Sequence, residues 1–287
     1  MNTNIVLKNY NAHERDKNIQ FFEEGHKYII LSDPNSKYTS VTTWAHSHFP
    51  HFDADKIIEA MMKGKGWKEG HKYWGLTPDQ IKSQWNSNKD SVAGAGTSLH
   101  YEIECFMNNG HLSSGYNHAD LYNDYLNGLN NNLTEGLKEK PIEWQYFINY
   151  VKDLPDFKPY RTEWTIYHEE LKLAGSIDMI YENADGSLDI YDWKRCKEIT
   201  RINNFNKFAV TRCISQFPDA NFWHYSLQLN IYKAILEEKY DKKIRNLCLV
   251  KLHPENEDKN YEIIPLPNLT NEIKELFEEL REKNRIK

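Results

Sequence analysis

The chain has 287 residues, of which 39% are hydrophobic and 27% are charged, a composition typical of a globular rather than a disordered protein. This length allows one large domain with insertions or two small domains. The formal net charge of −6 argues against indiscriminate coating of nucleic acid, but it says little about a localised groove for such a polymer.

The sequence shows no targeting segment. It has no apolar run long enough to span a bilayer, and its first residues lack the basic and apolar regions of a secretory signal. We therefore expect an intracellular protein that is not secreted and has no membrane partner. The cysteines are scattered and form no CxxC pair, so we expect free thiols and neither a zinc site nor an iron–sulfur cluster. They are Cys105, Cys196, Cys213 and Cys248.

The N-terminal third reads as a series of short elements. We expect a hairpin over residues 19–31, a strand or the start of a helix over 39–44, and a helix over 52–63 that begins near Asp53. A further helix should start at Thr77-Pro78, with Thr77 as the cap, proline in the first position and Gln80 completing a capping box. We group residues 1–92 as an N-terminal elaboration that supports a substrate channel.

The remaining residues, 93–287, are expected to form the main domain. Gly94 should open a helix that ends near Asn108, and residues 109–140, rich in Asn, Gly and Ser, read as an insertion. The elements expected after it are a helix over 142–151, strands over 160–167, 173–181 and 187–194, a basic connection over 195–221, a helix over 222–240, a strand over 244–252 and a terminal helix over 269–283.

Two predicted strands carry the most informative side chains. One strand ends its apolar run at Asp178, and the next contains Asp192, Trp193 and Lys194. Because side chains alternate along a strand, Asp192 and Lys194 share one face and Trp193 points to the other. If the two strands form a hairpin, Asp178 lies on the same side. Two carboxylates and an ammonium would then converge, which suits a hard divalent cation and a lysine that orients or activates a water molecule.

Three further residues have both an ordinary and a functional interpretation. His100 is either a half-buried histidine with a hydrogen-bonded ring or a ligand of Mn²⁺ or Mg²⁺. Glu104, one helical turn later, either supports such a site or belongs to a solvated face, which we favour over direct ligation. Glu163 is either an exposed strand carboxylate or a group that reaches the site from a neighbouring strand.

The helix over residues 222–240 carries a polar pair, Gln228 and Tyr232, spaced four apart. It is either the polar edge of an amphipathic helix or a glutamine that packs over the site and contacts the substrate backbone or the lysine. Basic residues interleaved with aromatic ones can bind single-stranded nucleic acid, although a solvated loop has the same composition. In this chain they are Arg195, Lys197, Arg201, Lys207 and Arg212 with Phe205, Phe208 and Phe217, and, in a second segment, Lys63, Lys65, Lys68 and Lys72 with Trp67 and Tyr73.

Taken together, these residues resemble a known nuclease pattern. The pattern consists of Gly96-Thr97 with His100, Glu163, Gly175 with Asp178, Asp192 with Lys194, and Gln228-Leu229 with Tyr232. It is similar to the PD-(D/E)XK nuclease superfamily, and within it to the RecB-like exonuclease branch, which includes the mitochondrial genome maintenance exonuclease and proteins of large DNA viruses. The likeness covers about residues 94–253. The usual proline–aspartate pair is Ile177-Asp178 here, and the absence of a four-cysteine cluster excludes the iron–sulfur subgroup.

The resemblance implies roles for individual residues. Asp178, Asp192 and His100, with the backbone carbonyl of Trp193, would bind one or two Mg²⁺ or Mn²⁺ ions, and Lys194 would assist the attacking water. Glu163 and Gln228 would be supporting catalytic positions, and Tyr232 would pack behind them and line the substrate path. Substrate contacts would also come from Arg195, Arg201, Lys207, Arg212 and Lys65.

The resemblance also implies a fold and an activity. We expect an α/β fold with a restriction-endonuclease-like core, in which a central mixed β-sheet is flanked by helices, and with N-terminal helical additions. The expected activity is metal-dependent hydrolysis of DNA, at single-stranded ends rather than internally, in replication, repair or recombination, by a monomer in the cytoplasm, the nucleus or a viral replication compartment.

Two other functions fit the same pattern. One is a structure-specific or RNA-cleaving endonuclease, which would cut a circular single strand that an end-dependent enzyme spares. The other is a non-catalytic module that binds DNA ends. Such a module would have lost the lysine or one acidic residue, and this chain retains all of them.

Overall fold

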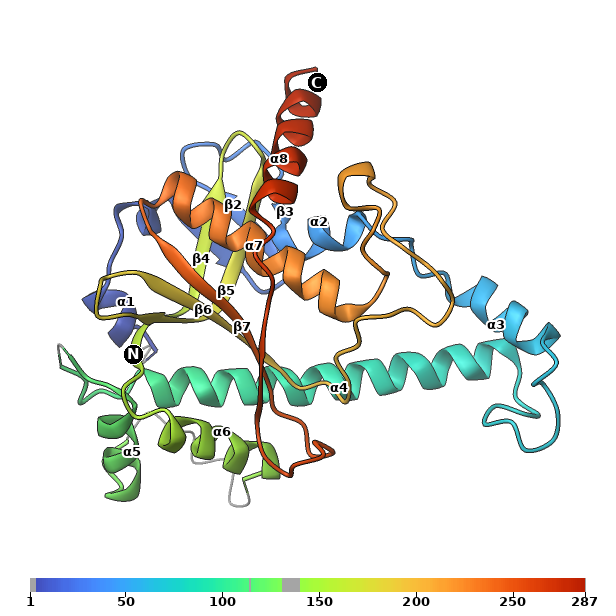
Figure 1. Cartoon of the computed structure of the whole chain (residues 1–287), viewed down its shortest axis with the longest axis horizontal. Coiled ribbons are helices and arrows are strands. Elements are labelled where there is room, and N and C mark those ends of the chain that lie inside the picture. Colours follow the sequence, from blue (N-terminus) through green and yellow to red (C-terminus); the bar gives the residue numbers. More distant parts are fainter. Residues whose placement is uncertain (1–3, 114, 131–139, 287) are drawn as a thin grey trace.

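The computed structural model describes residues 4–113, 115–130 and 140–286 (Figure 1). The helices are α1 (Val6–Tyr10), η1 (Glu14–Asn18), α2 (Val41–Ser47), α3 (Ala54–Lys63), α4 (Pro78–Met107), α5 (His118–Leu126), α6 (Ile142–Asp153), η2 (Arg212–Ile214), α7 (Asn221–Lys239) and α8 (Thr270–Arg285). The strands are β1 (Ile19–Phe22), β2 (Lys27–Ile30), β3 (Thr39–Ser40), β4 (Lys158–His168), β5 (Leu173–Glu182), β6 (Leu188–Lys194), β7 (Ile244–Lys251) and β8 (Glu262–Pro265).

The main sheet is mixed. Strand β5 pairs antiparallel with β4 along one edge, and along the other edge it pairs first with β3, in parallel, and then with β6, antiparallel. Strands β6 and β7 are parallel, and β8 closes the order antiparallel to β7. The crossover between the parallel strands β6 and β7 contains α7. The expected α/β fold with a mixed sheet between helices is confirmed.

Helices cover both faces of the sheet (Figure 1). Helices α2, α7 and α8 enclose a core that includes Ile190, Leu227 and Phe277. Helices α4, α5 and α6 lie on the opposite face, over a second core that includes Phe147 and Trp193. Strand side chains that alternate between faces therefore enter two different cores.

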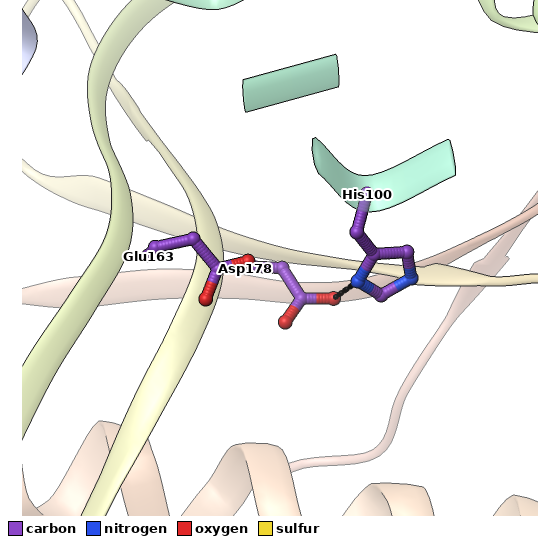
Figure 2. A group of neighbouring side chains, drawn as sticks. All are labelled: His100, Glu163 and Asp178. Carbon is purple, nitrogen blue, oxygen red and sulfur yellow. Dashed lines mark ion pairs between the residues drawn. The ribbon is translucent and has the colours of Figure 1, made fainter. Parts of the chain in front are cut away.

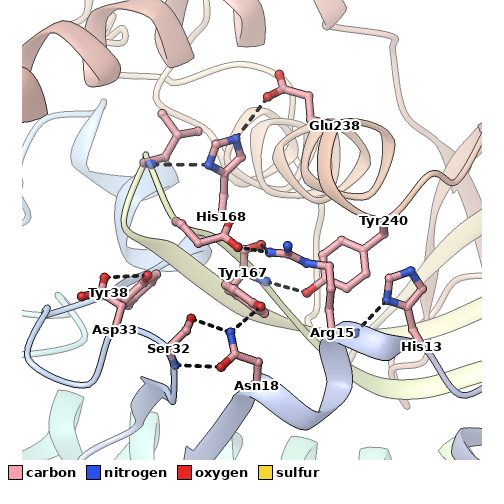
Figure 3. Close-up of polar contacts among 12 residues, drawn as sticks. His13, Arg15, Asn18, Ser32, Asp33, Tyr38, Tyr167, His168, Glu238 and Tyr240 are labelled. Atoms are coloured by element: carbon pink, nitrogen blue, oxygen red, sulfur yellow. Dashed lines mark hydrogen bonds and ion pairs between the residues drawn. The ribbon is translucent and has the colours of Figure 1, made fainter.

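The N-terminal segment is part of the main fold. Arg15 donates to the backbone oxygen of Tyr167 on β4 at 3.2 Å, and its guanidinium lies 4.1 Å from the centre of that ring. Asn18 donates to the Tyr167 hydroxyl at 2.8 Å, and the Tyr167 amide donates to the Tyr240 hydroxyl at 3.0 Å (Figure 3). The hairpin expected over 19–31 is present as β1 and β2, and its turn places Gly25 and His26 at positive φ.

Helix α4 differs from the expectation. We expected one helix to start at Thr77-Pro78 and another at Gly94, but a single helix of 30 residues runs from Pro78 to Met107. Thr77 and Gln80 form the expected capping box. The boundary expected between residues 92 and 93 thus falls within a continuous helix. Each interior glycine costs a helix about 1 kcal/mol relative to alanine, which did not suffice to end it.

Other expectations are refined. Residues 39–47 form both a short strand and a helix, and Asp53 caps α3 as expected. Part of the expected insertion, residues 114 and 131–139, lies outside the described residues, and α5 occupies part of the rest. Helix α1 and strand β8 were not predicted. No helix within the described ranges is both long and apolar enough to cross a membrane.

Candidate metal centre

The site lies where strands β5 and β6 separate. Their backbone pairing ends at Met179 and Tyr191. At the next position of β5, the side chain of Asp178 takes the place of a backbone acceptor. Its Oδ2 accepts a hydrogen bond from the backbone N–H of Trp193 at 3.1 Å. The remaining carboxylate lone pairs stay available at the point where the strands part.

The neighbouring strand is distorted at the same level. Glu163 lies on β4 between the pairs Thr162–Met179 and Trp164–Ile177, and is therefore opposite Asp178. Its φ of +42° is in the left-handed region, which costs a non-glycine residue about 1–3 kcal/mol and often marks a functional site.

The distortion breaks the normal alternation of side chains. Ile177 belongs to the core beneath α7, whereas Met179, two residues later, belongs to the core beneath α4 and α6. Beyond this point Ile180 and Tyr181 again enter different cores, so the change of face occurs at the level of Glu163 and Asp178. It brings carboxylates of adjacent strands close to one another.

Helix α4 contributes the third member. Nδ1 of His100 lies 3.5 Å from Oδ2 of Asp178, and its Nε2 lies 3.0 Å from the backbone oxygen of Trp193. Within the described residues, ligand atoms of His100, Glu163 and Asp178 all lie within 4.8 Å of one another (Figure 2). Ser176 donates to Oε2 of Glu163 at 2.9 Å and so orients that carboxylate.

Asp192 and Lys194 form an ion pair beside this trio. The side chains share one face of β6 as predicted, and the Lys194 ammonium lies 4.5 Å from the centre of the Tyr225 ring on α7. The ring of Trp193 points the other way, as predicted, and packs edge-to-face against Phe147 and Tyr150. Asp192 is only 2% exposed, so its charge depends on the neighbouring ammonium.

The local electrostatics favour a cation. Burial and the negative charge of Asp178 raise the pKa of Glu163 to about 8 and that of Asp192 to about 6. Burial opposes the charge of Lys194, but the carboxylates of Asp192 and Asp178 outweigh it and raise the pKa of that ammonium. Glu163 therefore keeps its proton at neutral pH while no metal is bound, and a divalent ion would displace that proton and balance the charge of the clustered carboxylates.

The donor set fits Mg²⁺ or Mn²⁺. Carboxylate oxygens with one imidazole nitrogen are suitable ligands for these ions. The trio differs from the set implied by the resemblance, because it includes Glu163, expected as a support. Asp192 is instead engaged by Lys194, and the carbonyl of Trp193 faces His100.

Helix α7 packs over the site. Tyr225, Gln228 and Tyr232 lie on one side of the helix, and Gln228 is 8% exposed between the two tyrosines. Tyr232 is 3% exposed and packs so closely on β5 that a Cβ added at Gly175 would lie 2.7 Å from its ring. Tyr232 therefore packs behind the site, as expected. Its ring is enclosed in the core and does not line a substrate path, which corrects that second expectation.

The expected basic contacts are in different environments. Arg195 pairs with the buried carboxylate of Glu143 on α6, through Nε at 2.7 Å and Nη2 at 2.6 Å. The charge of Arg195 is therefore neutralised within the fold. Arg201 stacks over Phe222 at 4.1 Å and is exposed. Lys207, Arg212 and Lys65 are also exposed. Lys65 follows α3, and that helix lies away from the sheet (Figure 1).

The aromatic residues of the connection between β6 and α7 also differ in exposure. Phe205 is 83% exposed and Phe208 is 45% exposed, whereas Phe217 is 6% exposed and stacks on Trp223. Phe217 is therefore a packing residue, which corrects the expectation that it stacks on bases.

Sequence reasoning missed several residues around the trio. Ser176 and Tyr225 lie next to motif residues, but only tertiary contacts show what they touch. Glu104 is not on a solvated face: burial raises its pKa to about 7, and its charge acts on Glu163.

No protein-family model matches the chain, and no curated protein matches its sequence significantly. The nuclease likeness therefore rests on the motif residues alone.

Proposed function

We propose that this protein is a divalent-metal-dependent deoxyribonuclease with a restriction-endonuclease-like core. The observation that carries the proposal is the convergence of His100, Glu163 and Asp178 at the point where β5 and β6 separate, with Lys194 beside them. Positively charged groups and a metal ligand set of this kind are the usual means of stabilising charge in phosphoryl transfer.

A Mg²⁺ or Mn²⁺ ion would be held by His100, Glu163 and Asp178, and when bound it would supply positive charge and lower the pKa of water. Lys194 would donate a hydrogen bond to the attacking water or to a phosphate oxygen, because an ammonium has only donors. Asp192 keeps that ammonium in place through the ion pair. Gln228, on the covering helix, would contact either the lysine or the substrate backbone.

The preference for single-stranded ends is supported by the resemblance to the RecB-like branch. Exposed Arg201 and Lys207 on the connection between β6 and α7 would contact phosphates, and exposed Phe205 would stack on a base. Arg195 is not part of this proposal, because its guanidinium is paired with Glu143.

The test compares DNA substrates labelled at the 5′ or the 3′ end. Single-stranded, duplex and circular forms are incubated with Mg²⁺ or Mn²⁺ and the wild-type protein, Asp178→Asn or Lys194→Ala. The matched control is Asp156→Asn, which removes an exposed carboxylate away from the site. We expect degradation of linear single strands that needs the metal and is lost in both site variants. Equal degradation by the site variants would exclude the site, and cleavage of the circle would exclude the end-dependent mode.

A further inference from the structure

A separate lobe projects from the sheet domain at the N-terminal end of α4 (Figure 1). We define this aromatic lobe as residues 52–85, which comprise α3, the connection after it and the first turns of α4. Its small interior contains Ile58 and Ile81, which are 1% and 0% exposed. An ion pair of 2.6 Å between Lys82 and Asp55 joins its two helices.

Large aromatic side chains remain on the outside of the lobe. Trp74 is 48% exposed and Phe52 is 65% exposed. Trp67 is half-buried, and its ring lies 5.7 Å from that of Trp74 and 5.0 Å from that of His71. Since the lobe has its own buried residues, these faces are not needed to complete its interior, and they offer flat apolar surfaces to a ligand.

The connection that carries these rings is ordered. Backbone hydrogen bonds close successive tight turns, from Trp67 to Gly64 at 3.0 Å, from His71 to Lys68 at 3.0 Å and from Trp74 to His71 at 2.9 Å. The aromatic faces are therefore held in place before any ligand binds, which lowers the entropic cost of binding.

The same segment is positively charged. Between residues 63 and 75 there are four lysines and one glutamate, in a chain whose overall charge is −6. Lys63 pairs with Glu59, and the Lys72 ammonium lies 5.1 Å from the Tyr73 ring centre. Lys65 and Lys68 are exposed next to Trp67. Lysines beside exposed aromatic rings favour a polyanion with accessible base faces, which a single strand has and a duplex does not.

Helix α4 sets the distance between the lobe and the metal centre. Residues 86–94 are all exposed, as in a helix that bridges two bodies through solvent. From Trp85 to His100 the helix advances about 22 Å. At the 3.4 Å spacing of a stacked strand, this corresponds to about six nucleotides.

We infer that the aromatic lobe binds single-stranded DNA, with Trp74 and Trp67 stacking on bases and Lys65 and Lys68 neutralising phosphates. This inference rests on the proposed function, because it identifies how the same substrate strand is held. It adds a second binding site, distinct from the connection between β6 and α7.

The test measures strand binding without hydrolysis. Fluorescence anisotropy of a labelled fifteen-nucleotide oligothymidylate is recorded with the full-length protein in EDTA, so that no divalent ion is present. We expect Trp74→Ala to weaken binding by about tenfold and Trp74→Phe to retain most of it, because stacking needs only an aromatic face. The double variant Lys65→Glu/Lys68→Glu should weaken binding and reduce its salt dependence, whereas Lys8→Glu on α1 should do neither. Circular dichroism checks that each variant is folded.

Three results would overturn the inference: no binding by the wild type, unchanged affinity in the folded Trp74→Ala variant, or binding of duplex or of oligouridylate that equals or exceeds that of oligothymidylate. A separate assay, hydrolysis of bis(p-nitrophenyl) phosphate by the wild type with Mn²⁺, tests the metal centre without a strand. Hydrolysis of this ester without lobe-dependent DNA binding would reject the lobe alone, and lobe-dependent binding without hydrolysis would reject the nuclease function alone.

Discussion

Nδ1 of His100 lies 3.5 Å from Oδ2 of Asp178, so the imidazole on α4 is in direct contact with the carboxylate on β5. His100 also touches the backbone oxygen of Trp193 through its second nitrogen. The imidazole therefore links the helix to both strands that part at the site, and a metal ion would replace the contact between His100 and Asp178.

His100→Ala should lower the affinity for Mn²⁺ by about 10–100-fold, because it removes the only nitrogen donor of the trio. Isothermal titration calorimetry with Mn²⁺ measures this effect. The matched control is His51→Ala, which removes an exposed histidine outside the trio and should leave the affinity unchanged. If both variants bind Mn²⁺ as the wild type does, His100 is not a ligand.

Lys194→Met should destabilise the metal-free protein by about 3 kcal/mol, because it leaves the buried carboxylate of Asp192 without its cation. Urea denaturation gives the free energy of unfolding. Lys251 lies beside Lys194 in the register of β7 and pairs with Glu262, which is 52% exposed. Lys251→Met should therefore cost less than about 1 kcal/mol. Equal costs for the two variants would contradict the assigned ion pair.

Gly175→Ala should destabilise the protein by about 1–3 kcal/mol, since the added methyl group would lie 2.7 Å from the ring of Tyr232. The comparison is Gly94→Ala on α4, where a methyl group meets no atom within 4 Å. That variant should be more stable by about 0.5–1 kcal/mol, because alanine favours the helix. Thermal unfolding of both variants checks the opposite signs, and a stabilised Gly175→Ala protein would refute the close packing.

His118 should make the protein less stable in acid. It is 0% exposed, and burial lowers its pKa from 6.5 to about 3. Above pH 6.5 neither the folded nor the unfolded state binds the proton. Between pH 6.5 and about 3 the unfolded state takes it up and the folded state does not, so stability falls as the pH falls, by up to about 1.4 kcal/mol per pH unit.

Urea denaturation between pH 7.5 and 4.5 measures that slope. The His118→Asn variant lacks the titrating imidazole. Its free energy of unfolding should therefore fall less steeply than that of the wild type as the pH is lowered over this range. Curves of the same steepness for both proteins would show that His118 is not the group responsible.

Arg201→Glu/Lys207→Glu should weaken the binding of single-stranded DNA and reduce its salt dependence, because both side chains are exposed on the basic connection. Mn²⁺ affinity should not change, since neither residue belongs to the trio. Lys17→Glu/Lys27→Glu alters the net charge equally at exposed positions elsewhere and serves as the control. Unchanged DNA binding in the first variant would refute the placement of the strand.

Much of the local structure could be predicted from short-range pattern. The alternation that places Asp192 and Lys194 on one face, with Trp193 on the other, depends on residues two apart and was correct. The caps at Asp53 and Thr77 were also predicted, because a cap is set by a side chain and the amides that follow it. In such cases neighbouring residues hold the necessary information.

The sequence by itself thus determined the order of the central strands and helices and the residue types available for a metal site. Tertiary structure alone decided that Glu163 lies beside His100 and Asp178, that the Tyr232 ring is enclosed in the core and that Arg195 forms an ion pair with Glu143. It also decided that α4 runs unbroken past Gly94. The physical reason is that each outcome depends on partners far away in the chain, whose packing and charge outweigh the weaker local preferences.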